Sequence, residues 1–170
     1  MKSLIESAMY QLMDPAVAPE LSGVKDGDIV ENKKLILSSK REVFIHDLIK
    51  NGPLILIFIR GTWCPFCRLH MQRLNKWLNS RDKNNRGTCI VVSSESLEDI
   101  NKWLNENNFS YLFASDSKLE LANYFGVHIA PRDFSQAATF LIDQNSHVRM
   151  AYRGKRTNTN FKKLDENLRS

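Results

Sequence analysis

Long apolar segments are missing from this sequence of 170 residues. No run approaches the roughly 20 apolar residues that a membrane-spanning helix needs. Residues 1–20 contain no uninterrupted apolar core of the length found in signal peptides, and they include Glu6 near the start. The sequence also has no internal repeat and no low-complexity tract. We therefore expect a protein that has no membrane partner and lies in the cytoplasm.

Cysteine is also scarce, with three residues in the whole chain. An odd number argues against the fully paired framework of a secreted protein. Cys64 and Cys67 are separated by only a proline and a phenylalanine. In a reducing compartment, two cysteines at this spacing are more often catalytic or metal-binding than structural.

A zinc site and a structural disulfide stay open as alternatives for the cysteine pair, although redox chemistry is favoured over both. A structural zinc site commonly needs a second pair of Cys or His ligands at short spacing. Here Cys89 stands alone and the four histidines are scattered. A structural disulfide between such close neighbours closes a loop that is too small to stabilise the fold much. We predict no metal and no organic cofactor.

The overall composition is that of a globular protein, with 42% hydrophobic and 25% charged residues. The length fits one compact domain, which we place at residues 21–170. An N-terminal helical extension is predicted at 1–20, because apolar residues recur at helical spacing between positions 3 and 13. A turn at Asp14 and Pro15 ends it.

The formal net charge of +5 is concentrated in two segments. Residues 60–86 contain seven Lys or Arg and one acidic residue, and residues 144–170 contain seven and two. A solvated surface is the ordinary explanation of such runs. The alternative is a docking face for an acidic protein, with nucleic acid less favoured.

Apolar patterning predicts alternating strands and helices. The continuous apolar run at 53–59 predicts a strand buried on both faces. A helix follows from Pro65 to Trp77 or beyond, predicted from four residues that share one helical face. They are Cys67, Met71, Leu74 and Leu78.

Further elements complete the pattern. Strands are predicted at 88–94 and 111–115, and helices at 97–104, capped by Ser93 or Ser94, and at 118–126, ended by Gly126. Residues 138–143 and 147–152 predict an antiparallel hairpin, and a C-terminal helix begins at about 159. Residues 34–39 are a weak strand candidate. The order predicts an α/β fold whose central mixed sheet has a parallel core, a C-terminal antiparallel hairpin and helices on both faces.

The position of Cys64 indicates what the cysteine pair does. Pro65 is favoured at the first position of a helix, so the helix N-terminus lies at Cys64. A thiolate there faces backbone N–H groups and the positive end of the helix dipole. Arg60, Arg68 and His70 are nearby residues that would add positive charge, and we expect them to help lower the pKa of the Cys64 thiol. Cys64 is thus the candidate nucleophile, and Cys67, one turn into the helix, resolves a mixed disulfide with it.

The residues around the pair have weaker interpretations. Trp63, Pro65 and Phe66 flank the two cysteines and are candidates for the surface that meets a substrate, although packing would also explain the two aromatic residues. His70 follows Cys67 by three residues, where a spectator role is favoured over a proton shuttle. Cys89 lies in an apolar strand and is interpreted as a small buried hydrophobe.

The segment RGTWCPFC, residues 60–67, follows a core strand and resembles a family element. The RG-x-WCP-[YF]-C pattern is similar to that of the peroxiredoxin-like branch of the alkyl hydroperoxide reductase and thiol-specific antioxidant superfamily. The resemblance extends over about residues 21–168 and implies a thioredoxin-like fold. It implies that Cys64 and Cys67 form a redox-active disulfide. It also implies a peroxide or a protein or low-molecular-weight disulfide as substrate, and an external dithiol reductant of the thioredoxin or glutathione type.

Three positions depart from these relatives, and the remote arginine of peroxiredoxins is not assigned to one residue. Thioredoxins place a buried Asp six residues before the first cysteine, where this chain has Phe58, and a cis-proline just before the hairpin, where it has Ala137. Ala137 is therefore a candidate substrate contact by register, and Pro131 is the nearby proline. Peroxiredoxins place a Thr three residues before the reactive cysteine, where this chain has Gly61, with Thr62 displaced by one. The candidates for the remote Arg of peroxiredoxins are Arg60, Arg68 and Arg132.

Two function hypotheses follow. The first is a peroxiredoxin-like thiol–disulfide oxidoreductase in which Cys64 attacks and Cys67 resolves. The second is a non-catalytic binding or redox-sensing module. In it, the helix after the cysteines and the C-terminal helix lie on one side of the sheet and merge residues 68–86 and 149–169 into a basic docking face.

Overall fold

The computed structural model describes residues 23–84, 86–154 and 158–169. The predicted helix at 3–13 lies outside the described residues, and the division of the chain at residue 20 stays a prediction. None of the helices in the described ranges is long and apolar enough to cross a membrane.

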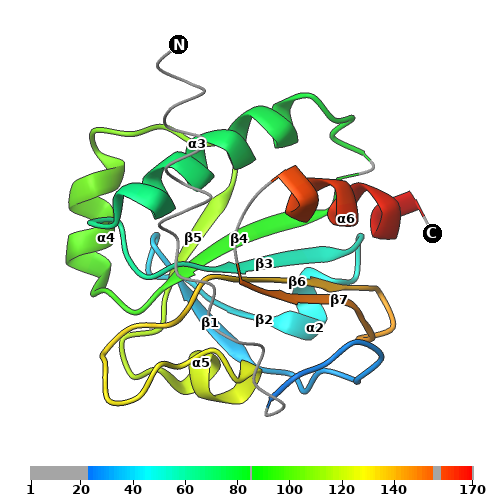
Figure 1. Ribbon diagram of the computed structural model, residues 1–170, viewed down its shortest axis with the longest axis horizontal. Coiled ribbons are helices and arrows are strands. Elements are labelled where there is room, and N and C mark those ends of the chain that lie inside the picture. The colour runs from blue at the N-terminus through cyan, green and yellow to red at the C-terminus, as the bar shows by residue number, and fades with distance from the viewer. Residues whose placement is uncertain (1–22, 85, 155–157, 170) are drawn as a thin grey trace.

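A seven-stranded mixed sheet organises the described residues (Figure 1). Its spatial order is β2-β1-β5-β4-β3-β6-β7. Strands β3, β4 and β5 are parallel, whereas β6 runs antiparallel to β3 and to β7. The predicted parallel core and C-terminal antiparallel hairpin are confirmed. The strands are β1 (Lys34–Leu37), β2 (Glu42–Phe44), β3 (Leu54–Phe58), β4 (Thr88–Ser93), β5 (Leu112–Ser115), β6 (Ala138–Ile142) and β7 (Val148–Arg153).

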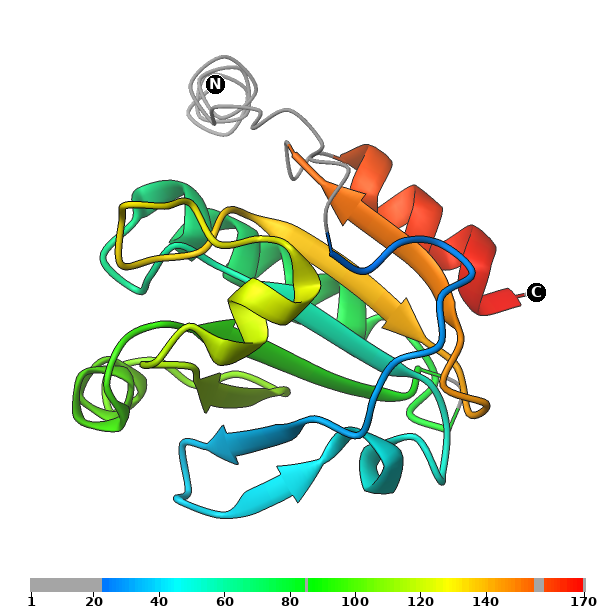
Figure 2. The same cartoon turned by 90° about the horizontal axis from the view of Figure 1, so that it is seen from below.

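Helices cover both faces of the sheet (Figures 1 and 2). They are α2 (Ile45–Leu48), α3 (Pro65–Asn79), α4 (Leu97–Leu104), α5 (Glu120–Phe125) and α6 (Asn158–Arg169). Buried side chains of α3, α4 and α6 share one apolar cluster, and those of α2 and α5 belong to a second cluster. The expectation that α3 and α6 lie on the same side is therefore confirmed.

Strand β3 lies between these two clusters and is buried along its whole length. Because alternate side chains of a strand point to opposite faces, Ile55 and Ile57 face α3 while Leu56 and Phe58 face α5. Phe58 packs against Phe125 and Phe140, with ring centroids 5.4 and 5.8 Å away. The continuous apolar run predicted at 53–59 is explained by this double burial.

Two features differ from the sequence expectations. The weak strand candidate at 34–39 is β1, and it forms an antiparallel hairpin with β2, which was not predicted. The expected cap of α4 at Ser93 or Ser94 is wrong, because β4 continues through Ser93. Ser96 is the N-cap instead, and its hydroxyl oxygen accepts the Asp99 N–H at 3.1 Å. Gly126 ends α5 with a φ of 69°, in the left-handed region that favours glycine.

The aromatic cluster around Phe140 gives a stability prediction. Phe140 is fully buried, and its ring centroid lies 4.7 Å from that of Phe125. Phe140→Ala removes these contacts and leaves a cavity, so we expect a loss of about 3–5 kcal/mol in the free energy of unfolding. Urea titration measures it. Phe44→Ala, at a residue that is 38% exposed, is the control and should cost less than about 1 kcal/mol. Equal losses in the two variants would contradict this account of the core.

Candidate active site

The loop between β3 and α3 ends at Cys64, which lies at the start of the helix. Cys64 is the N-cap of α3, with φ −80° and ψ 120°, and Pro65 is the first helical residue. The Cys64 carbonyl accepts the N–H of Arg68 at 3.0 Å, and the Cys64 N–H donates to the Gly61 carbonyl at 3.2 Å. The predicted helix start is confirmed. A first turn directs its N–H groups toward the N-cap, and here they belong to Phe66 and Cys67, because proline has none.

Both cysteines of the pair are buried. Cys64 is 3% exposed and Cys67 is not exposed at all. They belong to the apolar cluster between the sheet and helices α3, α4 and α6. Cys67, Met71, Leu74 and Leu78 form the buried stripe of α3 that the sequence predicts.

Trp63 makes the exposed surface beside Cys64. Its side chain is 54% exposed, and its ring meets the edge of Phe134 at 5.6 Å between centroids. A Cβ atom at position 61 would overlap the indole, so Gly61 permits this close approach. Pro65 is exposed and Phe66 is partly buried against the apolar cluster. Of the three residues flanking the cysteines that are predicted to meet a substrate, Trp63 and Pro65 are thus accessible on the surface.

Glu95, just after β4, forms hydrogen bonds with the loop between β3 and α3. Sequence analysis did not identify this residue. Its carboxylate accepts the Thr62 N–H at 2.8 Å, the Thr62 hydroxyl at 2.7 Å and the Ser93 hydroxyl at 2.6 Å. Thr62 follows β3 and Glu95 follows β4, so the parallel pairing of these strands brings the two residues together. Hydrogen bonds to a charged group are stronger than neutral ones.

Arg68, on the first turn of α3, also binds Thr62. Its Nε donates to the carbonyl oxygen of Thr62. Thr62 is therefore bound through its N–H, its hydroxyl and its carbonyl, and its hydroxyl proton is directed at Glu95 rather than at the cysteine. The remaining two candidates for the remote arginine lie apart from this contact: Arg132 is positioned over the Phe134 ring at 5.5 Å, and Arg60 is half-buried just after β3.

The loop before β6 packs against the cysteine loop. The Ser135 hydroxyl donates to the Ile59 carbonyl at 3.0 Å, and Phe134 contacts Trp63. The Ala130–Pro131 peptide bond in this loop is cis. Ala137, the position expected by register to meet a substrate, is only 4% exposed, and its carbonyl accepts the Gly154 N–H at 3.4 Å.

Two further residues have clear structural roles. Phe58, at the position of the thioredoxin Asp, faces the α2 and α5 side of the sheet, away from α3. Cys89 is 6% exposed in β4, and burial raises the pKa of its thiol. The interpretation of Cys89 as a buried hydrophobe is confirmed.

Comparison with known protein families agrees with this site. Residues 27–151 match the model of the AhpC/TSA family. The chain belongs to the AhpC/TSA family. The thiol:disulfide interchange protein DsbE of Escherichia coli K12 is 32% identical over 124 residues, which cover 69% of this chain and 59% of DsbE. A thioredoxin-like protein of Haemophilus influenzae is 25% identical over 87 residues, or 51% of this chain and 50% of that protein. The chain thus spans between half and three fifths of these relatives.

Solved structures show the fold of this family member. Peroxidoxin BcpB of Mycobacterium tuberculosis superposes with a TM-score of 0.77 at 21% identity, covering 86% of this chain and 97% of BcpB. A cysteine-to-serine mutant of PrxQ from Xylella fastidiosa has a TM-score of 0.75 at 23% identity, covering 85% of this chain and 96% of PrxQ. The predicted thioredoxin-like fold and the resemblance to peroxiredoxins are confirmed.

A groove of about 450 Å³ lies beside the cysteine loop of this AhpC/TSA protein. Trp63 and Trp103 supply its aromatic surface, and its charged groups have both signs. Its lining residues are Thr62, Trp63, Arg68, Glu95, Asp99, Lys102, Trp103 and Glu106. Thr62 and Trp63, the two residues before Cys64, line the groove, so a bound molecule would lie beside the cysteine loop.

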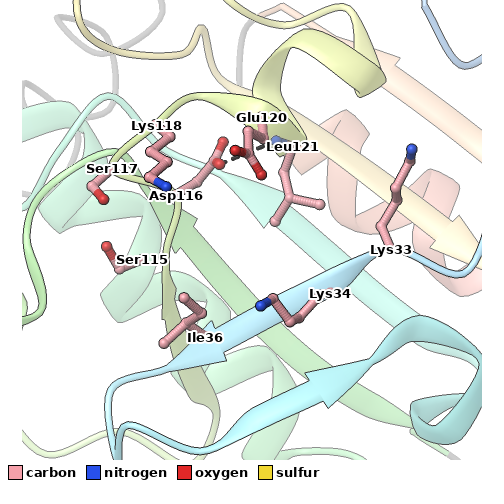
Figure 3. A pocket seen from close by; sticks show the side chains of 9 residues that line it. All are labelled: Lys33, Lys34, Ile36, Ser115, Asp116, Ser117, Lys118, Glu120 and Leu121. Carbon is pink, nitrogen blue, oxygen red and sulfur yellow. Dashed lines mark hydrogen bonds between the residues drawn. The ribbon is translucent and has the colours of Figure 1, made fainter.

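A second pocket, of about 250 Å³, contains none of the predicted site residues (Figure 3). Its central carboxylate, Asp116, accepts the N–H groups of Leu121 and Ala122 at 3.1 and 2.8 Å. Burial raises the pKa of Asp116 in spite of these bonds. Asp116 therefore has a structural role at the start of α5. The lining is Lys33, Lys34, Ile36, Ser115, Asp116, Ser117, Lys118, Glu120 and Leu121.

Across the described ranges, no group of three His, Cys, Asp or Glu side chains is placed to hold a metal ion.

The hydrogen bonds between Glu95 and Thr62 predict that mutations at these two positions have coupled effects on the free energy of unfolding. Glu95→Gln removes the charge that accepts three hydrogen bonds, so we expect a loss of about 1.5–3 kcal/mol in the free energy of unfolding. Thr62→Val should cost less when it is made in the Glu95→Gln background than in the wild type. Urea titration of the double-mutant cycle measures this coupling. Glu98→Gln, at an exposed residue of α4, is the control, and additive losses for Glu95 and Thr62 would contradict the contact.

Proposed function

We propose that this AhpC/TSA protein is a two-cysteine thiol oxidoreductase in which Cys64 is the nucleophile and Cys67 the resolving residue. The observation that carries the proposal is the place of Cys64 at the N-cap of α3, with Cys67 one turn later in the same buried cluster. Backbone N–H groups at a helix start stabilise a thiolate. Because both thiols belong to one turn of one helix, the pair can close a disulfide with little movement of the chain.

The proposed reaction has two steps. The Cys64 thiolate attacks an oxygen of a peroxide, the O–O bond breaks, and Cys64 becomes a sulfenic acid. The leaving alkoxide, or hydroxide from hydrogen peroxide, takes up the proton that Cys64 released when its thiolate formed. With a disulfide, it attacks one sulfur and releases one thiol, leaving a mixed disulfide. In either case Cys67 attacks the Cys64 sulfur, and the Cys64–Cys67 disulfide forms as water or the second thiol leaves. An external dithiol of the thioredoxin or glutathione type returns two electrons.

The surface around Cys64 supports a set of contacts for this reaction. Trp63 and Pro65 are exposed beside Cys64, so we propose that they meet the substrate first, with Phe66 behind them. Ala137 stays a proposed contact by register, although its side chain is buried. Arg68 lies on the first turn of α3, and we propose that it and Arg60 add positive charge near the Cys64 thiolate. The cytoplasmic location stays a prediction.

Cysteine variants test the proposal. Cys64→Ser should abolish turnover of both hydrogen peroxide and oxidised glutathione with dithiothreitol as reductant, because the attacking sulfur is gone. Cys67→Ser should react once and stop at a Cys64 sulfenic acid or mixed disulfide, which intact mass detects. Cys89→Ser is the matched control and should keep full activity, because that thiol is buried and unreactive. The larger kcat/KM decides between a peroxidase and a disulfide reductase. Full activity in Cys64→Ser would contradict the assignment.

A second candidate function rests on the charge of the α3 and α6 side. Helix α3 carries Arg68, Arg73 and Lys76 and no acidic residue, and α6 adds Lys162, Lys163 and Arg169 against two acidic residues. Arg81, just after α3, forms an ion pair with Asp165 of α6. These cations on neighbouring helices favour an acidic protein surface as a binding partner.

Salt-dependent binding tests the docking function. We expect poly-L-glutamate to bind the protein, with Kd rising at least tenfold between about 0.05 and 0.5 M salt. Replacing Lys162 and Lys163 by Gln should weaken binding, whereas the same change at Lys40 and Lys118, outside α3 and α6, should not. Equal effects of the two double variants would show that net charge alone drives the binding.

A further inference from the structure

We propose that His70 is the general base that takes the proton from Cys67 in the resolving step. This inference rests on the proposed function, because it requires that Cys67 attack the Cys64 sulfur. It assigns a catalytic task to a residue that the sequence pattern alone favours as a spectator.

The resolving step needs a base inside the protein. A thiolate, not a thiol, attacks a sulfur atom, so Cys67 must lose its proton. Cys67 is entirely buried, and burial among apolar side chains disfavours the charged thiolate. Bulk water does not reach this sulfur to accept the proton. A neighbouring side chain must therefore hold the proton while the new S–S bond forms.

The position that carries the acid in thioredoxins does not supply this base. Phe58 occupies it, and its side chain packs against Phe125 and Phe140 on the opposite side of the sheet. Apart from the cysteines, the buried side chains among the described residues that gain or lose a proton are Asp116, Tyr111 and His70. The Tyr111 hydroxyl donates to the Met71 carbonyl at 2.8 Å. Asp116 is engaged at the start of α5. His70 is the one that belongs to the same helix as Cys67.

The geometry places His70 beside Cys67. Residues three apart on a helix are neighbours, with Cβ atoms about 5–6 Å apart. Both side chains are completely buried, so both face the interior side of α3. The His70 ring is stacked on Phe161 of α6, with centroids 5.5 Å apart and an interplanar angle of 25°, and Phe161 also contacts Trp77 at 5.7 Å. Stacking fixes the ring plane and leaves the two nitrogen atoms on the ring edge.

The proposed role requires a neutral imidazole in the resting state. From α3, His70 has Cys67, Met71 and Leu74 on its own buried face. From α6 the buried or stacked residues are Asn160, Phe161 and Leu164, none of them charged. The carboxylate of Asp165 is engaged by the Trp77 indole N–H at 3.1 Å and by Arg81. Burial disfavours the imidazolium ion, and a neutral imidazole carries one nitrogen lone pair that accepts a proton.

The proton balance closes within the site. Neutral His70 accepts the proton from Cys67 and becomes an imidazolium ion. The Cys67 thiolate attacks the Cys64 sulfur, a new S–S bond forms, and the bond from Cys64 to the substrate sulfur or to the hydroxyl oxygen breaks. The leaving thiolate or hydroxide takes up one proton, and His70 returns to its neutral form. No oxidant is needed beyond the substrate that has already reacted with Cys64.

The aromatic disulfide dithionitrobenzoate separates the two steps in one experiment. Attack by Cys64 releases the first coloured thiolate, and attack by Cys67 releases the second. In stopped flow, His70→Phe keeps a stacking ring without its nitrogens, and His70→Gln keeps a polar side chain without the base. We expect the first release to change less than about threefold and the second to slow by about 100-fold or more at pH 7, in the range for lost general-base catalysis.

The pH dependence provides a readout that a packing role would not change. The rate of the second release in both variants should rise about tenfold per pH unit, because only hydroxide then removes the Cys67 proton, whereas the wild-type rate should reach a plateau.

Met71→Leu, on the same buried face of α3, is the control and should keep both phases. If His70→Phe does not fold by circular dichroism, His70→Gln decides the outcome. Wild-type rates and pH profile in the folded variant would overturn the role of His70. Absence of both phases in the wild type would instead contradict the proposed function, and with it this inference.

Discussion

Cys64 is the N-cap of helix α3, so the backbone that starts the helix also fixes the place of this residue in the fold. Pro65 sets the first helical dihedral and has no N–H to donate, so the N–H groups of the first turn belong to Phe66 and Cys67. Strand β3 anchors the opposite end of the loop in the centre of the sheet. Because α3 packs through Cys67, Met71 and Leu74, the same stripe that holds the helix to the sheet also carries the second cysteine.

Contacts from neighbouring strands hold the loop in place. Glu95, just beyond β4, binds Thr62 through two hydrogen bonds, and Ser135, before β6, binds the Ile59 carbonyl. Adjacent strands on both sides of β3 therefore fix the segment that leads to Cys64. The arrangement uses the Thr62 hydroxyl for positioning, which separates this chain from peroxiredoxins that place a threonine three residues before the reactive cysteine. It also leaves Trp63 as the exposed side chain beside the pair.

The sequence predicts those parts of the structure that local patterns specify. The buried stripe of α3, the N-cap at Cys64 and the end of α5 at Gly126 each follow from residue types at fixed spacing. The hairpin of β1 and β2 was not predicted as a pair, because the segment before β3 mixes Pro, Gly and charged residues without a clear period. The role of Glu95 depends on the pairing of β3 with β4 and on the length of β4. Polar residues just after two adjacent parallel strands are the signal that would have indicated it.

A redox titration followed by mass spectrometry tests the central claim most directly, that Cys64 and Cys67 form one reversible two-electron couple. The protein is equilibrated in dithiol buffers of known potential, quenched with an alkylating reagent and digested. We predict that one disulfide, between Cys64 and Cys67, appears with a Nernst slope of about 30 mV per tenfold change in ratio, while Cys89 stays a thiol throughout. If the two cysteines are alkylated independently at every potential and no disulfide joins them, the account is wrong.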